Sequence, residues 1–257
     1  MAGQCREGER VVNYRIQDLS WTEFDERRKA TTTVIIPTGA VEIYGPHLPM
    51  GTDSLVASAL ALRVAEKTGA LVAPTIEMGE SSMLLDYPGT LTLKKSTYEA
   101  VMDDLCTDLI GYGFRNLMFI NGHAGNVDTV NYLARRYQRE KGVRCGQVDW
   151  WRFAAVHGME IFEMKAHMAH GHASECGTSV VLALRPDLVD MSKATRIEPP
   201  AKPWQDYTDF IRYLSFKDRT PNGTVGDATL GTAGKGKALL DKCVDRICDY
   251  MTHEFGL

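Results

Sequence analysis

The segment TVIIPTGAVEIYGPHLPMGTD, residues 33–53, joins a short apolar run to a loop that carries two carboxylates. The run at 33–37 is rich in β-branched residues, which is typical of a buried strand. Glu42 and Asp53 follow it, with Tyr44 between them. A loop of this composition at the end of a strand indicates a functional site as well as a connection.

Apolar runs and helical patterns alternate along the rest of the chain. Further strands are predicted at residues 70–74, 116–120 and 143–148, and helices at 53–68, 96–113, 126–141, 174–185 and 235–253. Alternation of this kind predicts an α/β fold, with a mostly parallel sheet flanked by helices on both faces. We expect residues 1–257 to form one domain, because the length suits a single core and no internal repeat interrupts it.

Local signals set the expected ends of these helices. Asp53 is a candidate N-cap for the first of them, and Gly69 is its stop signal. Ser96 and Glu99 have the spacing of a capping box at the start of the second. Residues 192–232 are rich in proline and glycine, so we expect a long irregular excursion or an oligomer contact there rather than a second domain.

The composition excludes several classes of function. A net charge of -4 and a mean hydropathy of -0.22 describe an ordinary globular protein without the basic field that attracts nucleic acid or acidic lipid. We expect no membrane span and no secretory signal, because no apolar run has the required length. The six cysteines include no CxxC pair, which predicts reduced thiols and a cytoplasmic location.

Polar residues follow two of the predicted strands. Glu42 and Asp53 come after the strand at 33–37, and His123 comes after the strand at 116–120. Ligands of open α/β sheets bind beyond the carboxyl ends of the strands, so we expect these three side chains to converge there. A Glu, Asp and His set suits zinc, manganese or iron. Each residue alone also has a structural interpretation, as a helix cap, a loop acid or a turn histidine.

A third polar segment, residues 165–179, contains three histidines and a glutamate. His172 and Glu175 lie three residues apart at the start of a predicted helix, so both can face a ligand. An imidazole and a carboxylate in this position suit general acid–base work on metal-activated water. We expect His167 and His170 to be surface or supporting residues.

Four segments resemble the signature motifs of the creatininase (creatinine amidohydrolase) family, in the family's order and spacing. They are PTGAVEIYGPHLPMGTD at 37–53, YPGTLTL at 87–93, NGHAGN at 121–126 and GHASECGTS at 171–179. The segment GDATLGTAGKGKALL at 226–240 also resembles that family's entry into its last helix, so the resemblance covers about residues 15–255. It implies a metal held by Glu42, Asp53 and His123, a small-molecule substrate and a homo-oligomer, specifically a hexamer.

Three departures from the family pattern concern the metal. The family's second metal takes a histidine at the position of Tyr44, and acidic residues stand in creatininase relatives at the positions of Gly125 and Gly177. A neutral phenol binds a divalent ion poorly, so these departures predict one divalent metal per chain. Zinc is the expected ion, with iron and manganese as alternatives. Tyr44 would then contact the substrate or fill the vacated space.

Other departures concern the pocket. Met168 and Ala169 stand where creatininase presents a tryptophan and an aspartate, and Met83 and Leu84 replace an acid–histidine pair. Ser81 is retained as a candidate substrate contact. These replacements predict a more apolar pocket and argue against creatinine as the substrate.

The activity that the resemblance implies is hydrolysis of a C–N bond in an amide or cyclic amide by metal-activated water. Glu175 would shuttle the proton or complete the metal's ligand shell, while His172 would stabilise the oxyanion or protonate the leaving group. Backbone N–H groups from Ala124 onward would contact a substrate oxygen. Two alternatives stay open: ring-opening of a cyclic ketone or lactone, such as an inosose-type sugar derivative, and an inactive metal-binding scaffold.

Overall fold

Four parallel strands form the centre of the protein, which we describe from a computed structural model covering residues 12–198 and 215–257. The strands are β1 (Thr33–Thr38), β2 (Leu71–Val72), β3 (Asn116–Asn121) and β4 (Arg144–Asp149). Their order in the sheet is β2-β1-β3-β4, and every neighbouring pair is parallel. All four strands lie at predicted positions, and the parallel arrangement confirms the predicted fold class.

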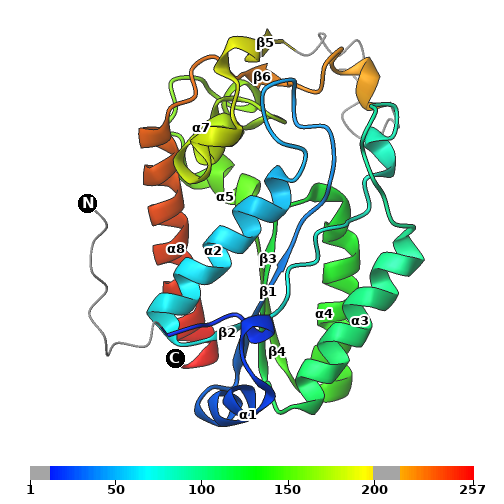
Figure 1. Cartoon of the computed structure of the whole chain (residues 1–257), viewed down its shortest axis with the longest axis vertical. Helices are drawn as coiled ribbons and strands as arrows, with labels where there is room; N and C mark the ends of the chain where they lie inside the picture. The colour runs from blue at the N-terminus through cyan, green and yellow to red at the C-terminus, as the bar shows by residue number, and fades with distance from the viewer. Residues whose placement is uncertain (1–11, 199–214) are drawn as a thin grey trace.

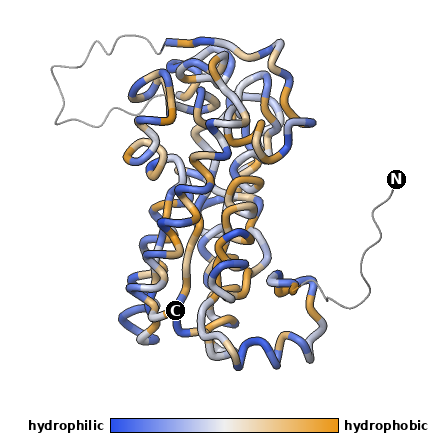
Figure 2. Tube along the Cα trace, turned by 90° about the vertical axis from the view of Figure 1, so that its left-hand side faces the viewer, coloured by the Kyte–Doolittle hydropathy of each residue, from blue (hydrophilic) through white to orange (hydrophobic). Residues whose placement is uncertain are grey.

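Helices cover both faces of this sheet (Figure 1). On one face lie α2 (Thr52–Thr68), α5 (Trp150–His157), α7 (Glu175–Leu184) and α8 (Ala233–Phe255). On the other lie α3 (Lys95–Gly111) and α4 (Val127–Lys141). Two shorter helices are α1 (Trp21–Ala30) and α6 (His167–His170). Figure 2 shows polar and apolar residues alternating around the helices, as helices with one buried face require.

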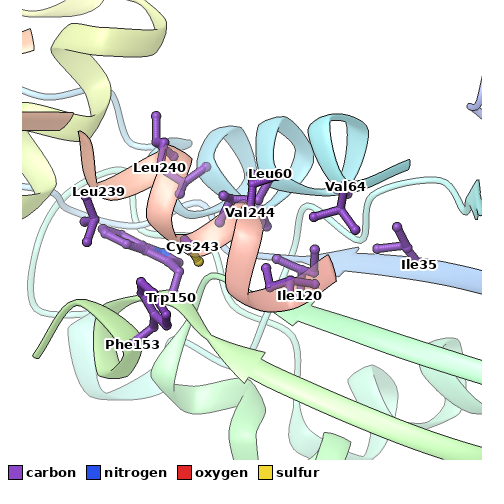
Figure 3. Packing of buried hydrophobic residues seen from close by; sticks show 14 of the residues in the cluster. Ile35, Leu60, Val64, Ile120, Trp150, Phe153, Leu239, Leu240, Cys243 and Val244 are labelled. Carbon is purple, nitrogen blue, oxygen red and sulfur yellow. The ribbon is translucent and has the colours of Figure 1, made fainter. Parts of the chain in front are cut away.

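Alternate residues of the strands supply the two halves of the core. Ile35 and Ile120 face the helices of the first layer, where Leu60 of α2 and Val244 of α8 pack near them (Figure 3). The intervening side chains, such as Phe119, belong to the second half of the core, against α3 and α4. Full burial of such a side chain contributes about 1.5–3 kcal/mol to the stability of the fold. Because successive side chains of a strand point to opposite faces, both faces of the sheet are held against helices.

One of the predicted helix-end signals is confirmed and two are wrong. Gly69 ends α2 in the left-handed conformation, with φ 73°, as predicted. The N-cap of α2 is Gly51, however, so the predicted capping role of Asp53 is wrong: Asp53 lies inside the first turn. The capping box predicted at Ser96 and Glu99 does not form either, because α3 begins one residue earlier, at Lys95, without a side-chain cap.

The region predicted to be irregular contains little regular structure where it is described. It holds β5 (Arg196–Ile197) and β6 (Gly226–Asp227), which pair as a small antiparallel ribbon, and the one-turn helix η6 (Phe216–Asp218). Residues 199–214 lie outside the described part of the chain. Figure 1 shows the ribbon near α7, beyond the end toward which the sheet strands run, so this region borders the site.

Two further predictions concern the cysteines and the possibility of a membrane-spanning helix. The five cysteines among the described residues are free thiols. Among the helices of residues 12–198 and 215–257, none combines the length and apolar character that a bilayer crossing needs.

Candidate metal centre

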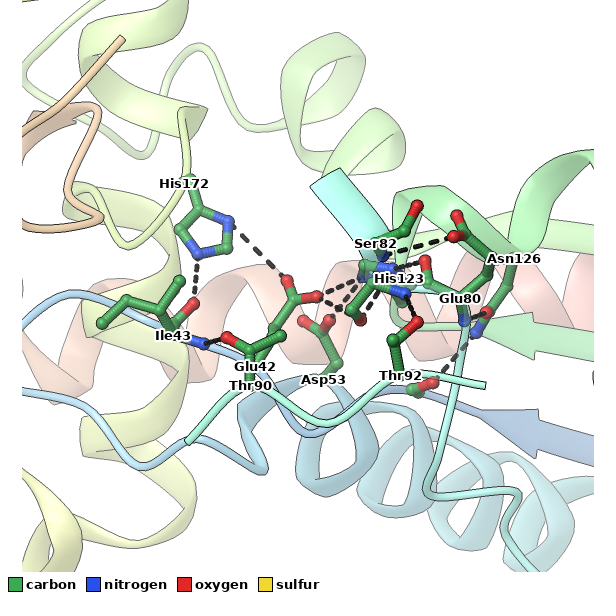
Figure 4. Close-up of polar contacts among 12 residues, drawn as sticks. Glu42, Ile43, Asp53, Glu80, Ser82, Thr90, Thr92, His123, Asn126 and His172 are labelled. Carbon is green, nitrogen blue, oxygen red and sulfur yellow. Dashed lines mark hydrogen bonds and ion pairs between the residues drawn. The ribbon is translucent and has the colours of Figure 1, made fainter. Parts of the chain in front are cut away.

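Three buried side chains meet at the carboxyl ends of β1 and β3. Glu42 comes from the loop after β1, Asp53 from the first turn of α2, and His123 from the residues after β3 (Figure 4). Nδ1 of His123 lies 2.9 Å from Oε2 of Glu42 and 3.2 Å from Oδ2 of Asp53. One ligand atom from each residue falls within 4.8 Å of the others, so the predicted convergence is present.

Neighbouring groups orient these side chains. Nε2 of His123 lies 2.7 Å from the carbonyl oxygen of Glu80, which can only accept a hydrogen bond. The proton of a neutral His123 therefore sits on Nε2, and the lone pair of Nδ1 is directed at the two carboxylates. Ser81 donates from Oγ to Oε2 of Glu42 at 2.8 Å. The structure thus places Ser81, which we predicted as a substrate contact, against a candidate ligand and in the lining of the adjacent cavity.

The electrostatics of the cluster favour a bound cation. Burial and the nearby charge of Glu42 raise the pKa of Asp53 to about 7. Burial opposes a charge on His123, but the hydrogen bonds that the protonated ring donates to Asp53 and Glu42 outweigh it and raise the pKa of the imidazole well above its ordinary value. Without a metal ion, a proton on His123 places one positive charge between the two buried carboxylates. A divalent ion would replace that proton, and two carboxylates with one imidazole suit zinc or manganese.

His172 lies beside this cluster with one nitrogen unengaged. Nε2 lies 2.6 Å from the carbonyl oxygen of Ile43, so this nitrogen carries the proton of the neutral ring. Nδ1 lies 4.0 Å from Oε1 of Glu42. Burial lowers the pKa of His172, which favours the neutral ring with a proton-accepting Nδ1. Phe216 of η6 packs edge-on against the imidazole, with ring centroids 5.1 Å apart.

Tyr44 fills space next to the same cluster. Its ring packs in a tilted arrangement against His172 with centroids 4.4 Å apart, and its hydroxyl lies within the influence of the Asp53 and Glu42 charges. Burial and the charges of Asp53 and Glu42 raise the pKa of the phenol well above its ordinary value, so the hydroxyl stays protonated. A Cβ added to Gly177 would lie 3.2 Å from Cε1 of Tyr44. The tyrosine ring therefore occupies the space that a side chain at position 177 would need.

A cavity of about 260 Å³ opens beside these residues. Seven of the eight predicted site residues line it: Glu42, Tyr44, Asp53, Ser81, His123, Ala124 and His172. Met83 and Leu84 contribute apolar surface, as expected, whereas Met168 is buried and is not part of the lining.

Sequence reasoning missed several lining residues. They are Trp150, Trp151, His170, Phe216 and Arg219. The two tryptophans directly follow β4, so the rule that sites form at the carboxyl ends of strands could have identified them. Phe216 and Arg219 come from the irregular region, and nothing in their local sequence indicates where they lie.

Comparison with known proteins agrees with this geometry. The family model described as creatinine amidohydrolase matches residues 17–251. The chain belongs to the creatininase family. Members of this family are metal-dependent amidohydrolases, and this chain is a hydrolase of that class.

Several creatininase-family relatives cover almost the whole chain. It is 32% identical to the creatinine amidohydrolase of Pseudomonas putida, with 93% of this chain and 96% of that protein aligned. It is 28% identical to the mycofactocin precursor peptide peptidase of Mycolicibacterium smegmatis, over 87% of each. It is 28% identical to the 3-dehydro-scyllo-inosose hydrolase of Thermotoga maritima, over 95% of this chain and 85% of that one.

Solved creatininase structures superimpose closely on the chain. A structure described as creatininase Mn gives a TM-score of 0.80 at 29% identity, with 95% of this chain and 99% of that chain covered. A mutant creatininase of the Zn-Zn type gives the same TM-score at 28% identity, over the same shares of the two chains. Creatininase structures thus contain manganese or zinc, and this chain has a triad of Glu42, Asp53 and His123 that could hold a metal ion.

Glu175 is the predicted site residue that the structure does not bring to the cavity. Its side chain is fully buried, and its carboxylate accepts hydrogen bonds from the backbone N–H groups of Glu163 and Met164, both at 3.0 Å. Nζ of Lys235 lies 2.7 Å from Oε1 of Glu175. These partners engage both carboxylate oxygens. The position fits a structural ion pair that anchors the segment before α6, not the general base or metal ligand that we predicted.

This anchoring role predicts a loss of stability on replacement of Glu175. We expect Glu175→Gln to lower the free energy of unfolding by about 2–3 kcal/mol, because it removes the buried charge that pairs with Lys235 and sets an amide N–H against a backbone N–H. Glu163→Gln is the matched control. Glu163 contacts the same Lys235 ammonium at the same 2.7 Å, but its side chain is 64% exposed.

The control change should lower the free energy of unfolding by about 1 kcal/mol or less. Urea denaturation of the metal-free proteins measures both values. Equal losses for the two variants would contradict a structural role that depends on burial.

Proposed function

We propose that this creatininase-family hydrolase cleaves an amide or cyclic amide C–N bond, using one divalent ion held by Glu42, Asp53 and His123. The observation that carries the proposal is the oriented imidazole: Nδ1 of His123 faces both carboxylates while Nε2 is held by the carbonyl of Glu80. Zinc is the ion we expect, with manganese or iron as alternatives. When bound, it would activate water and polarise the scissile carbonyl.

The residues of the chain supply positioning and proton transfer. Nδ1 of His172 is the proton acceptor, because its other nitrogen is held by the carbonyl of Ile43. The protonated ring can then return that proton to the leaving nitrogen. Tyr44 packs against His172 beside Asp53 and so restricts the space in which these two side chains can move. Ala124, at the start of a one-turn helix in the lining, offers its backbone N–H to a substrate oxygen.

Tyr44 and Gly177 support a single ion per chain. The phenol is protonated and packed against His172, so the space beside Asp53 holds an aromatic ring instead of a ligand. Among the described residues, one cluster of acidic, histidine or cysteine side chains could hold a metal ion. It consists of Glu42, Asp53 and His123.

The lining favours an amide with apolar surroundings over a sugar-like ring. Trp150, Trp151 and Phe216 contribute aromatic surface, and Met83 and Leu84 contribute aliphatic surface. A polyhydroxylated ring would need more hydrogen-bonding side chains than this wall provides. Creatinine is disfavoured because Met83 and Leu84 stand where the family has an acid–histidine pair. Ring-opening of an inosose-type substrate remains the second candidate, because the Thermotoga maritima relative is named for that reaction.

Metal content tests the proposal directly. Elemental analysis of the zinc-loaded, desalted protein should give one ion per chain. The double variant Tyr44→His, Gly177→Glu should bind more than one, because it removes the ring and supplies two further ligands. Two ions in the unaltered protein would contradict the single-ion site. No ion at all would favour the inactive scaffold.

A substrate panel tests the reaction. Cyclic amides, N-acyl amino acids, lactones, an inosose and creatinine should be compared with the loaded protein. Hydrolysis confined to amides supports the proposal, while hydrolysis of lactones or the inosose alone favours the second candidate. We also keep the proposals of a homo-oligomer and a cytoplasmic location, which sedimentation and cell fractionation would test.

A further inference from the structure

One lining residue is a cation with no role in the proposed chemistry. Among the described lining residues, Arg219 is the single arginine or lysine. It directly follows η6, and its backbone N–H donates to the carbonyl of Phe216 at 3.0 Å. Phe216 is buried between the rings of His172 and Tyr87, with centroids 5.1 and 6.4 Å away. The turn that carries Arg219 is therefore attached to the wall of the metal centre.

The guanidinium of Arg219 is available for a ligand. Within residues 12–198 and 215–257 it forms no hydrogen bond or ion pair, and the side chain is exposed. Lys217, two residues earlier in the same turn, differs: its ammonium lies over the ring of Tyr87, 5.6 Å from the centroid, and it does not line the cavity. The two positively charged side chains of this turn thus have different neighbours: Lys217 lies over Tyr87, and Arg219 lines the cavity.

The distribution of charge makes the outer part of the cavity favourable for an anion. The divalent ion would offset the charges of Glu42 and Asp53 at the inner end. Glu80 also lines the cavity and keeps its charge, but its Oε1 accepts a hydrogen bond from the backbone N–H of Ser82 at 3.2 Å, and no ion pair joins it to Arg219. Leu84 and Phe216 contribute apolar surface to the lining, so Arg219 supplies the positive charge of this wall.

We infer that Arg219 is a specificity-determining residue that binds an anionic oxygen group of the substrate, a carboxylate or a phosphate, at the end remote from the scissile amide. This inference rests on the proposed function, which places the amide at the metal. A guanidinium donates two parallel hydrogen bonds to such a group, a geometry that a lysine cannot offer. The substrate class is thus an amide or cyclic amide that already carries a negative charge before hydrolysis.

Alkyl hydroxamates provide the test, because the hydroxamate binds the metal and the tail reaches toward Arg219. Zinc-loaded full-length protein is titrated in a calorimeter with tails of increasing length that end in a carboxylate, a phosphate or a neutral amide. We expect one of the anionic tails to bind about tenfold tighter than the amide at the matching length. Which anion gains more distinguishes a carboxylate substrate from a phosphate substrate.

Substitutions identify the contact. Arg219→Gln should abolish the preference, and Arg219→Glu should make an ammonium tail the tighter ligand. Lys217→Gln, which removes the same charge from the same turn, should keep the preference. Equal affinity for anionic and neutral tails at every length, or an equal loss in Lys217→Gln, overturns the inference while the zinc site stands. Absence of bound zinc before any hydroxamate is added refutes the proposed function and this inference with it.

Discussion

His123→Ala should lower the affinity for zinc by at least about a hundredfold. The substitution removes the nitrogen that faces Glu42 and Asp53 at 2.9 and 3.2 Å, and with it one of the three ligands of the proposed site. Competition with a chelator of known affinity measures the change. Zinc should also stop raising the melting temperature, because stabilisation by a ligand depends on the ratio of its concentration to the dissociation constant.

His253→Ala is the matched control for this experiment. It removes the same imidazole from a side chain that is 74% exposed near the end of α8, where Nδ1 contacts the carbonyl of Asp249 at 2.9 Å. Zinc affinity should stay unchanged in this variant. Full zinc binding by His123→Ala would show that the ion is held elsewhere, and the proposed centre would have to be abandoned.

Gly125→Ala should damage both the fold and the metal centre. A Cβ at this position would lie 1.9 Å from the carbonyl oxygen of Glu80 and 2.6 Å from Nε2 of His123. The carbonyl would have to move, and the hydrogen bond that orients His123 would be lost. We expect a loss of about 3 kcal/mol in the free energy of unfolding and a drop in zinc affinity of about tenfold or more.

Gly111→Ala provides the comparison for this second experiment. It adds the same methyl group at the end of α3, where a Cβ would meet nothing within 4 Å. Its stability should equal or slightly exceed that of the unaltered protein, because alanine is the better helix former. A Gly125→Ala protein with normal stability and normal zinc affinity would show that the Glu80 carbonyl is not needed to orient His123.

The sequence was sufficient to predict the sheet and the three candidate ligands. Residues of β1 and β3 form uninterrupted apolar runs, and the ends of such strands meet at one edge of a parallel sheet, so Glu42, Asp53 and His123 could be placed together without coordinates. Tyr44 lines the same cavity and packs against His172, but whether it fills the place of a second ion stays a prediction.

Long-range contacts explain what could not be predicted. The sequence places Glu175 three residues after His172, which suggests a shared site, but its partner Lys235 is 60 residues further along the chain. The position of Arg219 depends on how Phe216 packs against His172, 44 residues earlier in the sequence, and no local pattern encodes that contact. Local periodicity specifies helices and strands, whereas these contacts depend on the assembled fold.

The ion pair between Glu175 and Lys235 also has a consequence for biosynthesis. All four strands of the central sheet precede residue 150, so they emerge early from the ribosome. The lysine that anchors the segment before α6 belongs to α8, which lies far beyond the sheet in the chain. The same helix contacts α2 through the Arg63–Asp241 ion pair. Domains generally complete their packing only when such distant segments are present. The segment before α6 therefore gains this anchor only after α8 has been synthesised, although the sheet and the three candidate ligands precede it in the chain.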